Sequence, residues 1–412
     1  MSVVKPFMCI RPNQAVAHRI AALPYDVYNR EEAKQEIQKE PMSFLRIDRS
    51  ETNFEDEVDT YDPRVYKKAK EILDEMIERG DFVVDNMECY YIYELVMNGR
   101  SQTGIVACAS IDDYLNNVIK KHENTREDKE IDRITHVDVC NAQTGPIFLA
   151  YRSREEINNV VEEAKKEETL YSFTAEDGVS HHVWRLSNRE KINTIRSAFS
   201  KISEIYIADG HHRTASAVKV GLKRRKDNPD YTGDEEFNYF LSVLFPHDQL
   251  MILPYNRTVK DINGLAKEQF INKIKESFEV IENGYTPYKP NNKATFGMLF
   301  DGSWYVLKAK DNIINRHDPV KALDVSILQD YLLRPILGIE DPRTDKRIDF
   351  IGGIRGLKEL ERRTLQDMRV AFSMYPTSID ELFAVSDAGM LMPPKSTWFE
   401  PKLRSGLFIH SI

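Results

Sequence analysis

A β-branched run, a glycine turn and an alanine-rich stretch follow one another in this chain, and together they constrain its fold most strongly. Residues 204–207 favour a strand, Asp209-Gly210 favours a turn, and residues 212–222 have the small and apolar spacing of a helix. A helix that begins directly after a turn leaves its first N–H groups unpaired, and its dipole favours an anion there. The segment therefore predicts a phosphate site at a helix N-terminus.

The residue types of this turn suit phosphate binding. Gly210 lets an anion approach the backbone, and Asp209 is a carboxylate that can bind Mg²⁺ or accept a proton. The donors are the side chains that follow the glycine: His211, His212, Arg213 and Thr214. Helix capping or surface ion pairing explains any one of these residues equally well. Their uninterrupted succession after a strand favours a functional site.

The composition is that of an ordinary globular protein with two or three subdomains. The chain has 412 residues, of which 41% are hydrophobic and 30% are charged. The net charge of −9 and the lack of a basic arm disfavour a nucleic-acid partner. No apolar run approaches the roughly 20 residues that cross a membrane, and no export signal is recognisable. A cytoplasmic protein with four reduced cysteines is expected, and a homodimer is compatible with the sequence.

Helical and strand patterns alternate along the chain and predict a mixed α+β fold. A helix is expected over residues 62–80, opened by Asp62-Pro63. Hairpin turns are expected at Asn98-Gly99 and Asp301-Gly302 because these dipeptides tolerate positive φ angles. Residues 237–245 and 250–253 are expected to form adjacent strands.

The turn motif also carries a resemblance to known proteins. Ala208 to Arg213, followed by Thr214, resembles the signature of the ParB/sulfiredoxin superfamily in the version found in free serine kinases. In that group a histidine-glutamate pair lies upstream, and here the matching pair is His122-Glu123. The separation of this pair from the turn is long for a compact member, which implies an insertion.

Nearly the whole chain resembles a large bacterial family with a domain of unknown function, related to the same superfamily. The matching segments are residues 23–27, 43–47, 121–125, 144–148, 253–257 and 392–402. The resemblance implies a ParB/sulfiredoxin-like core with large additions at both ends. The expected regions are an N-terminal α+β region at 1–100, a phosphate-binding core at 101–255 and a C-terminal α+β region at 256–412, which closes on the core.

The residues of the motif discriminate among the chemistries of the superfamily. Sulfiredoxins need a cysteine where this chain has His211, and the acidic net charge disfavours the DNA binding of ParB proteins. The resemblance therefore implies a Mg²⁺-dependent kinase that phosphorylates free L-serine. The donor is ATP, ADP or pyrophosphate, and no Walker A sequence shows how a nucleotide binds.

The resemblance also implies roles for individual residues. Glu123 or Asp209 orients or deprotonates the acceptor hydroxyl and the other assists with Mg²⁺, with Asp209 as the expected metal ligand. Both carboxylates are expected to face one cleft within roughly 10 Å. Further contacts to substrate or phosphate are expected from His122, Thr125, Lys395, Ser396 and Lys402.

Two other functions stay open at this point. The same phosphate-binding turn is compatible with a phosphatase that acts on phosphoserine or a related ester, with water as the acceptor. It is also compatible with a regulatory protein that binds a nucleotide without catalysing a reaction. The loop at residues 392–402 is equally well explained as a packed tail and as a segment that closes over the site.

Overall fold

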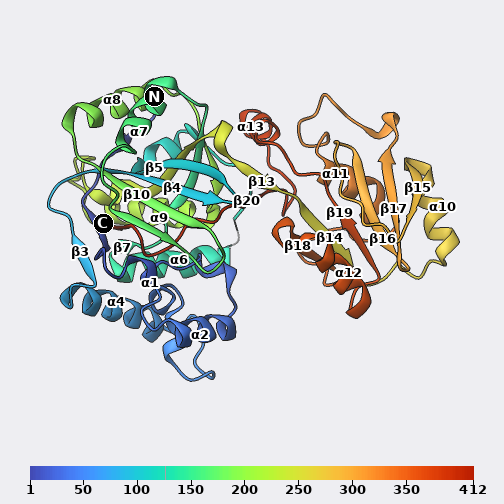
Figure 1. Ribbon diagram of the computed structural model, residues 1–412, viewed down its shortest axis with the longest axis horizontal. Coiled ribbons are helices and arrows are strands. Elements are labelled where there is room, and N and C mark those ends of the chain that lie inside the picture. The colour runs from blue at the N-terminus through green and yellow to red at the C-terminus, as the bar shows by residue number, and fades with distance from the viewer. Residues whose placement is uncertain (126) are drawn as a thin grey trace. The chain divides into compact units, whose positions relative to one another are not determined.

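The computed structural model describes residues 1–125 and 127–412, which form two compact units (Figure 1). The first unit comprises Met1–Leu250 together with Pro401–Ile412, and the second comprises Met251–Glu400. The second unit is therefore inserted near the end of the first. Each unit contains both helices and sheet, which confirms the predicted α+β class. The division into regions 1–100, 101–255 and 256–412 stays a prediction.

The first unit contains most of the strands and most of the longer helices. Its strands are β1 (Val4–Lys5), β2 (Cys9–Pro12), β3 (Phe82–Val84), β4 (Tyr90–Met97), β5 (Arg100–Ser110), β6 (Ile119–Lys120), β7 (Ala142–Gln143), β8 (Ile147–Tyr151), β9 (Tyr171–Thr174), β10 (Ser180–Leu186), β11 (Ile205–Asp209), β12 (Tyr239–Pro246) and β21 (Ile409–Ser411). Its helices are α1 (Ala17–Ile20), α2 (Arg30–Lys39), α3 (Leu45–Asp48), α4 (Pro63–Glu78), α5 (Ile111–Leu115), α6 (Glu127–Cys140), α7 (Glu155–Ala164), α8 (Arg189–Ser200) and α9 (His211–Asp227).

A nine-stranded mixed sheet forms the centre of the first unit (Figure 1). Its strands follow the order β6-β11-β8-β12-β5-β4-β10-β9, with β1 paired to β5. The β11 strand pairs in parallel with β6 and antiparallel with β8. Apolar side chains from several of these strands, including Ile105, Leu149 and Ile207, share one buried core. Because β11 is bonded on both sides, the position of the residues at its carboxyl end is fixed by the sheet.

Local signals placed several elements correctly. The α4 helix begins after Asp62, whose side chain accepts a hydrogen bond from the Arg64 N–H, and Gly80 follows its end with a φ of 78°. The hairpin of β4 and β5 turns at Asn98 and Gly99, with φ angles of 53° and 78°. Both residues of this turn need positive φ, which is the reason that the dipeptide predicts it.

The predicted pairing of residues 237–245 with residues 250–253 is wrong. The first segment forms β12, which pairs with β5 on one side and β8 on the other. The second segment forms β13 (Met251–Leu253), which pairs with β20 (Trp398–Glu400) in the second unit. A strand bonded along both edges has no edge left for its neighbour in the sequence, so proximity along the chain did not decide the pairing.

The second unit is built on a six-stranded sheet with the order β15-β17-β16-β19-β14-β18. Its further strands are β14 (Tyr255–Val259), β15 (Phe278–Gly284), β16 (Thr295–Phe300), β17 (Ser303–Ala309), β18 (Ile348–Gly352) and β19 (Val370–Ser373). Its helices are α10 (Lys267–Ser277), α11 (Asp324–Leu328), α12 (Gly356–Gln366) and α13 (Ile379–Asp387). The hairpin of β16 and β17 turns at Asp301 and Gly302, as predicted.

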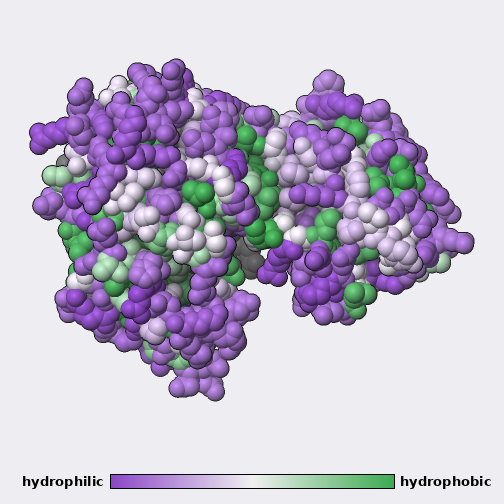
Figure 2. Space-filling model, viewed as in Figure 1, coloured by the Kyte–Doolittle hydropathy of each residue, from purple (hydrophilic) through white to green (hydrophobic). Residues whose placement is uncertain are grey.

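The surface in view is mainly hydrophilic, with smaller apolar patches between the polar groups (Figure 2). None of the helices within 1–125 and 127–412 has both the length and the apolar character needed to cross a bilayer.

We predict that Gly221→Ala destabilises the protein by about 1–3 kcal/mol, because a close-packed interface must then accommodate an extra carbon. A Cβ atom at residue 221 of α9 would lie 2.4 Å from the Phe237 carbonyl oxygen and 2.7 Å from Ile111 Cδ1. In an isolated helix the same change stabilises by about 1 kcal/mol. Urea denaturation measures the difference, with Leu222→Ala as the control because Leu222 is 41% exposed. A variant as stable as the wild type would show that α9 is not closely packed here.

We predict that Asp324→Asn makes the protein less sensitive to pH between about 4 and 7. Burial raises the pKa of Asp324 to about 7; one oxygen accepts from the Ala294 N–H, and the other has no hydrogen-bond partner among the described residues. The folded carboxyl group keeps a proton that the unfolded one releases near pH 4, so wild-type stability falls as pH rises through this window.

The asparagine variant stays neutral at every pH, so its free energy of unfolding relative to the wild type should be about 4 kcal/mol higher at pH 8 than at pH 4. Chemical denaturation of both proteins at the two pH values measures this difference, and contributions from other groups cancel in it. A difference that does not change with pH would show that Asp324 titrates as an ordinary surface carboxyl group.

Candidate active site

The end of β11 and the beginning of α9 form the strand, turn and helix that the sequence predicted. Asp209 is the last residue of β11, and Gly210 is the N-cap of α9, with a left-handed φ of 94°. Glycine adopts this conformation without strain. Because glycine has no side chain, α9 has no side-chain cap at this end. The N–H groups of its first turn are therefore available to an anion.

Arg213 lies against the backbone of this turn. A Cβ atom at Gly210 would lie 3.2 Å from both Nε and Nη2 of Arg213, and one at Gly145 would lie 3.6 Å from Nη1. The Nη1 group donates a hydrogen bond to the Pro146 carbonyl at 2.6 Å. Two glycines and one carbonyl thus orient the guanidinium group beside the N-terminus of α9.

Asp209 forms an ion pair with Lys402, which comes from the last part of the chain. Lys402 Nζ lies 3.0 Å from Asp209 Oδ2, while the Gly210 N–H donates to Asp209 Oδ1 at 2.9 Å. Desolvation raises the pKa of Asp209, but Lys402 and then Arg213 lower it more, so that it lies well below its usual range. Asp209 is therefore ionised at neutral pH and is a weak base.

The fit of Mg²⁺ to Asp209 follows from these two contacts. Magnesium prefers carboxylate oxygens with open lone pairs, phosphates and water. Lys402 and the Gly210 N–H each use one lone pair of an Asp209 oxygen, so lone pairs remain, but Lys402 already supplies a positive charge to this carboxylate. Lys402 therefore competes with Mg²⁺ for Asp209, and the role of Asp209 as a metal ligand stays a prediction.

The predicted pair His122-Glu123 lies next to His211. Glu123 Oε2 is 4.0 Å from His211 Nδ1, and the rings of His122 and His211 meet edge to face at 4.4 Å between centroids. The His122 backbone N–H points to His211 Nε2 at 3.4 Å. Two segments that are distant in sequence thus meet at the first residue of α9. Because His211 and Asp209 flank Gly210, both predicted carboxylates lie at this turn.

Burial keeps the two histidines neutral at pH 7. It lowers the pKa of His122 to about 4, despite the opposing charge of Asp209. It also lowers the pKa of His211 well below its usual range, and the neighbouring His122 adds to this effect. A neutral imidazole carries no charge to a phosphate, but it offers one donor and one lone pair.

Other predicted residues have partners within the protein. The Thr214 hydroxyl donates to the Gly210 carbonyl at 3.0 Å, and the Thr125 hydroxyl donates to the Glu130 carboxylate. The carbonyl of His212 accepts from the Ser216 hydroxyl at 2.7 Å, as an interior helix residue does. These contacts show how the turn is held, and the phosphate-binding roles of Thr125, His212 and Thr214 stay predictions.

Lys395 and Ser396 belong to the second unit. The Lys395 carbonyl accepts from Arg257 Nη2 at 3.0 Å, and the Ser396 hydroxyl donates to the Pro393 carbonyl at 2.6 Å. Their contact with substrate or phosphate stays a prediction. Lys402 belongs to the first unit and is therefore placed relative to the turn.

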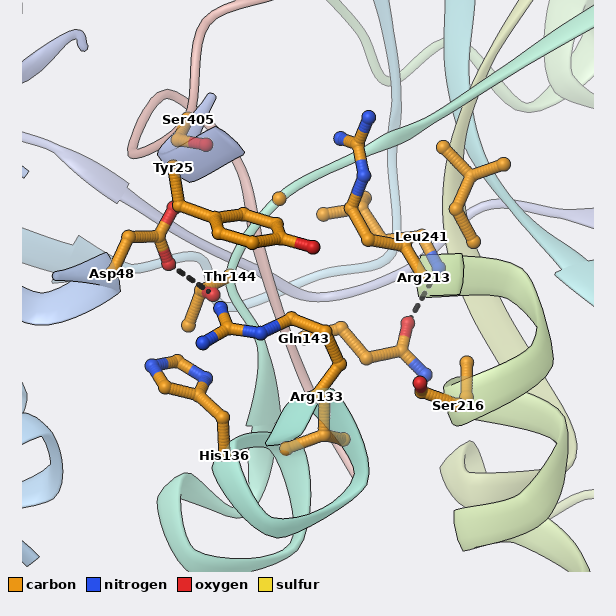
Figure 3. Close-up of a pocket in the computed structure, with 14 residues that line it drawn as sticks. Tyr25, Asp48, Arg133, His136, Gln143, Thr144, Arg213, Ser216, Leu241 and Ser405 are labelled. Carbon is orange, nitrogen blue, oxygen red and sulfur yellow. Dashed lines mark hydrogen bonds between the residues drawn. The ribbon is translucent and has the colours of Figure 1, made fainter. Parts of the chain in front are cut away.

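A small cavity, lined in part by charged and polar side chains, lies beside Arg213 (Figure 3). The guanidinium group of Arg133 lies 4.1 Å from the centre of the Tyr25 ring, and the Thr144 hydroxyl donates to Asp48 at 2.8 Å. The cavity has a volume of about 30 Å³, which suits a water molecule rather than a metabolite. It is therefore too small to hold the proposed substrate.

The residues around this cavity were not identified as a group from the sequence. Arg133 and His136 lie three residues apart on α6 and so share one face of the helix. That spacing is the one local signal that relates them. Asp48 and Gln143 come from other segments, and no local pattern connects them to α6.

A larger groove of about 600 Å³ lies elsewhere on the first unit. It is within the size range of metabolite sites and is lined by Tyr28, Asp177 and Arg404, among others. None of the predicted phosphate-binding residues is among the described residues that line it. At the turn itself, the side chains of Asp209 and Glu123 are 33% and 40% exposed, so solvent reaches both carboxylates.

Comparison with known proteins gives one family and several solved structures. A family model described as "Protein of unknown function (DUF1015)" matches residues 4–326. No curated protein matches the chain.

The solved structures with some similarity include a free serine kinase in complex with AMP, at 14% identity, 74% coverage of this chain, 91% of that chain and a TM-score of 0.35. A conserved hypothetical protein from Pyrococcus furiosus has 14% identity, coverages of 74% and 95%, and a TM-score of 0.35. SbnI with a C-terminal truncation, from Staphylococcus aureus, has 11% identity, coverages of 74% and 87%, and a TM-score of 0.40. With TM-scores below 0.5, these similarities do not by themselves indicate a shared activity.

Proposed function

We infer that this chain, which belongs to the DUF1015 family of proteins of unknown function, is a small-molecule phosphotransferase. We propose more specifically that it is a kinase that converts free L-serine to O-phosphoserine. The observation that carries the proposal is the meeting of an uncapped helix N-terminus, two cationic side chains and two carboxylates at Gly210.

The donor phosphates would bind at the beginning of α9. The first-turn N–H groups and the helix dipole favour an anion, and Arg213 and Lys402 bring positive charge to the same turn. Arginine is suited to grip a phosphate with two N–H groups. The donor is proposed to be ATP, ADP or pyrophosphate, and Mg²⁺ would be carried by its phosphates.

Glu123 fits the role of proton acceptor better than Asp209. Its carboxylate is 40% exposed beside His211, whereas the pKa of Asp209 lies well below its usual range. The serine hydroxyl would give its proton to Glu123 while its oxygen bonds to the terminal phosphorus. The bond from that phosphorus to the rest of the donor breaks, and the donor leaves one phosphate shorter. Asp209 would hold Lys402 in place.

A single set of incubations tests this proposal. The purified protein is mixed with L-serine, MgCl₂ and, in separate reactions, ATP, ADP or pyrophosphate, and phosphoserine is measured by mass spectrometry. We expect phosphoserine with at least one donor and much less with Glu123→Gln. Threonine, D-serine and homoserine serve as competing acceptors that define the specificity.

The same incubations separate the other two functions. Release of phosphate from O-phosphoserine in the absence of any nucleotide would indicate a phosphatase. Nucleotide binding in calorimetry without any product would indicate a regulator. The kinase proposal is abandoned if no donor yields phosphoserine.

A further inference from the structure

We propose that His122, Glu123 and His211 form a binding site for one divalent transition-metal ion of the zinc type. Each of these residues offers a ligand atom, and the ligand atoms all lie within 4.8 Å of one another. Two imidazoles and one carboxylate are a ligand set of catalytic zinc sites, in which water or substrate takes the fourth position. This set differs from the all-oxygen coordination that Mg²⁺ prefers.

The state of His122 points independently to a ligand. Its side chain is 2% exposed; the Ile207 carbonyl is the backbone acceptor that interacts with its ring, and neither ring nitrogen makes a hydrogen bond of normal geometry among the described residues. Buried polar groups are nearly always paired, because leaving one unpaired costs free energy. An ion bound to one ring nitrogen of His122 would supply the missing partner.

The three side chains need only a modest adjustment to close around an ion. Zinc bonds of about 2.0–2.1 Å in a tetrahedron place ligand atoms about 3.4 Å apart. The two histidines are buried, whereas the side chain of Glu123 is 40% exposed and is less restricted by packing than they are. The closure would therefore come mainly from Glu123.

A simpler explanation accounts for only part of the cluster. Glu123 Oε2 and His211 Nδ1, which lie 4.0 Å apart, form an ion pair only when His211 is protonated. That pair leaves the buried ring of His122, 4.4 Å from the ring of His211, without a hydrogen bond of normal geometry among the described residues. A metal ion gives all three side chains a partner, which is why we prefer it.

The site would lie directly beside the proposed phosphate turn, because His211 follows Gly210. With three protein ligands, at least one coordination position stays open for a hydroxyl or phosphate oxygen of a substrate. The inference shares Glu123 with the proposed kinase but rests on the geometry of the cluster rather than on that reaction. One carboxylate oxygen would bind the ion, and the other would stay available to a substrate.

Zinc titration of the full-length protein tests the site. The protein is freed of metal with a chelator, and ZnCl₂ is added in a calorimeter without serine or phosphoryl donor. We expect one zinc ion per chain, and about tenfold or greater weakening of binding in Glu123→Gln and in His211→Ala. Glu127→Gln and His182→Ala are matched controls that change the same residue types outside the cluster, and they should bind zinc as the wild type does. Cobalt absorption spectra of the same proteins report the coordination geometry.

The proposal is overturned if the wild-type protein takes up no zinc, or if the cluster variants bind zinc as well as the controls do. Circular dichroism shows whether His211→Ala is folded, and Glu123→Gln decides the question if it is not. A protein that makes phosphoserine but binds no zinc would refute only the metal site. A protein that binds zinc at this cluster but makes no phosphoserine would refute only the kinase.

Discussion

Asp209→Asn is expected to lower the rate of phosphoserine formation by about 100- to 1000-fold, the usual cost of removing one electrostatic group from a reacting site. The carboxylate holds Lys402 Nζ at 3.0 Å, at the point where the donor phosphates are proposed to bind. Asparagine has nearly the same shape but no charge, so Lys402 loses the interaction that orients it. The measurement is kcat with L-serine at saturating donor.

The control for this variant is Asp177→Asn, which removes a carboxylate from an ion pair with Arg404 in the same unit. It should keep wild-type activity. Because the Asp209 and Lys402 side chains are 33% and 18% exposed, Asp209→Asn should cost at most about 1 kcal/mol of stability. Unchanged activity would show that Asp209 has no part in the reaction. A much larger loss of stability would show that its role is structural.

The stability that Asp209 contributes also has a defined pH window. Its folded pKa is lowered from an unfolded value of 3.8, so the folded state favours the charged form. The contribution is therefore complete at pH values above about 4 and is lost as the pH falls toward the folded pKa. It does not change between pH 6 and pH 9, so activity changes in that range should not come from Asp209.

Arg213→Lys is expected to lower kcat/KM about ten- to a hundredfold, although the positive charge is kept. Arg213 Nη1 donates to the Pro146 carbonyl while the guanidinium group lies against Gly210. Lysine is a point charge and lacks the planar guanidinium group, which can donate to a backbone carbonyl and to a phosphate at the same time. A charge-assisted hydrogen bond contributes roughly 1.5–3 kcal/mol, which corresponds to this loss.

Arg225→Lys is the matched control, because Arg225 lies on the same helix and pairs with both oxygens of Asp112. It should alter stability slightly and leave activity unchanged. If Arg213→Lys keeps full activity, Arg213 does not grip the donor with two N–H groups. If it melts far below the Arg225 control, Arg213 serves mainly to hold the loop at Pro146.

Local patterns in the sequence were sufficient to place the turn that carries the proposed chemistry. A β-branched run before Asp209 and small residues after His211 determine strand and helix through side-chain periodicity, which acts within a few residues. Gly210 was predictable for the same reason, since a turn with positive φ needs glycine. The resemblance to a known family added His122 and Glu123, which no local rule connects to this turn.

The sequence by itself determined the secondary structure around Gly210 and the residue types available there, because both depend on short-range periodicity and backbone angles. Only the tertiary structure decided which distant groups meet at the turn. Lys402 reaches Asp209 from the end of the chain, and Pro146 accepts from Arg213, because the sheet places β11 between β6 and β8. Strand order depends on which edges stay free during packing, and no short stretch of sequence contains that information.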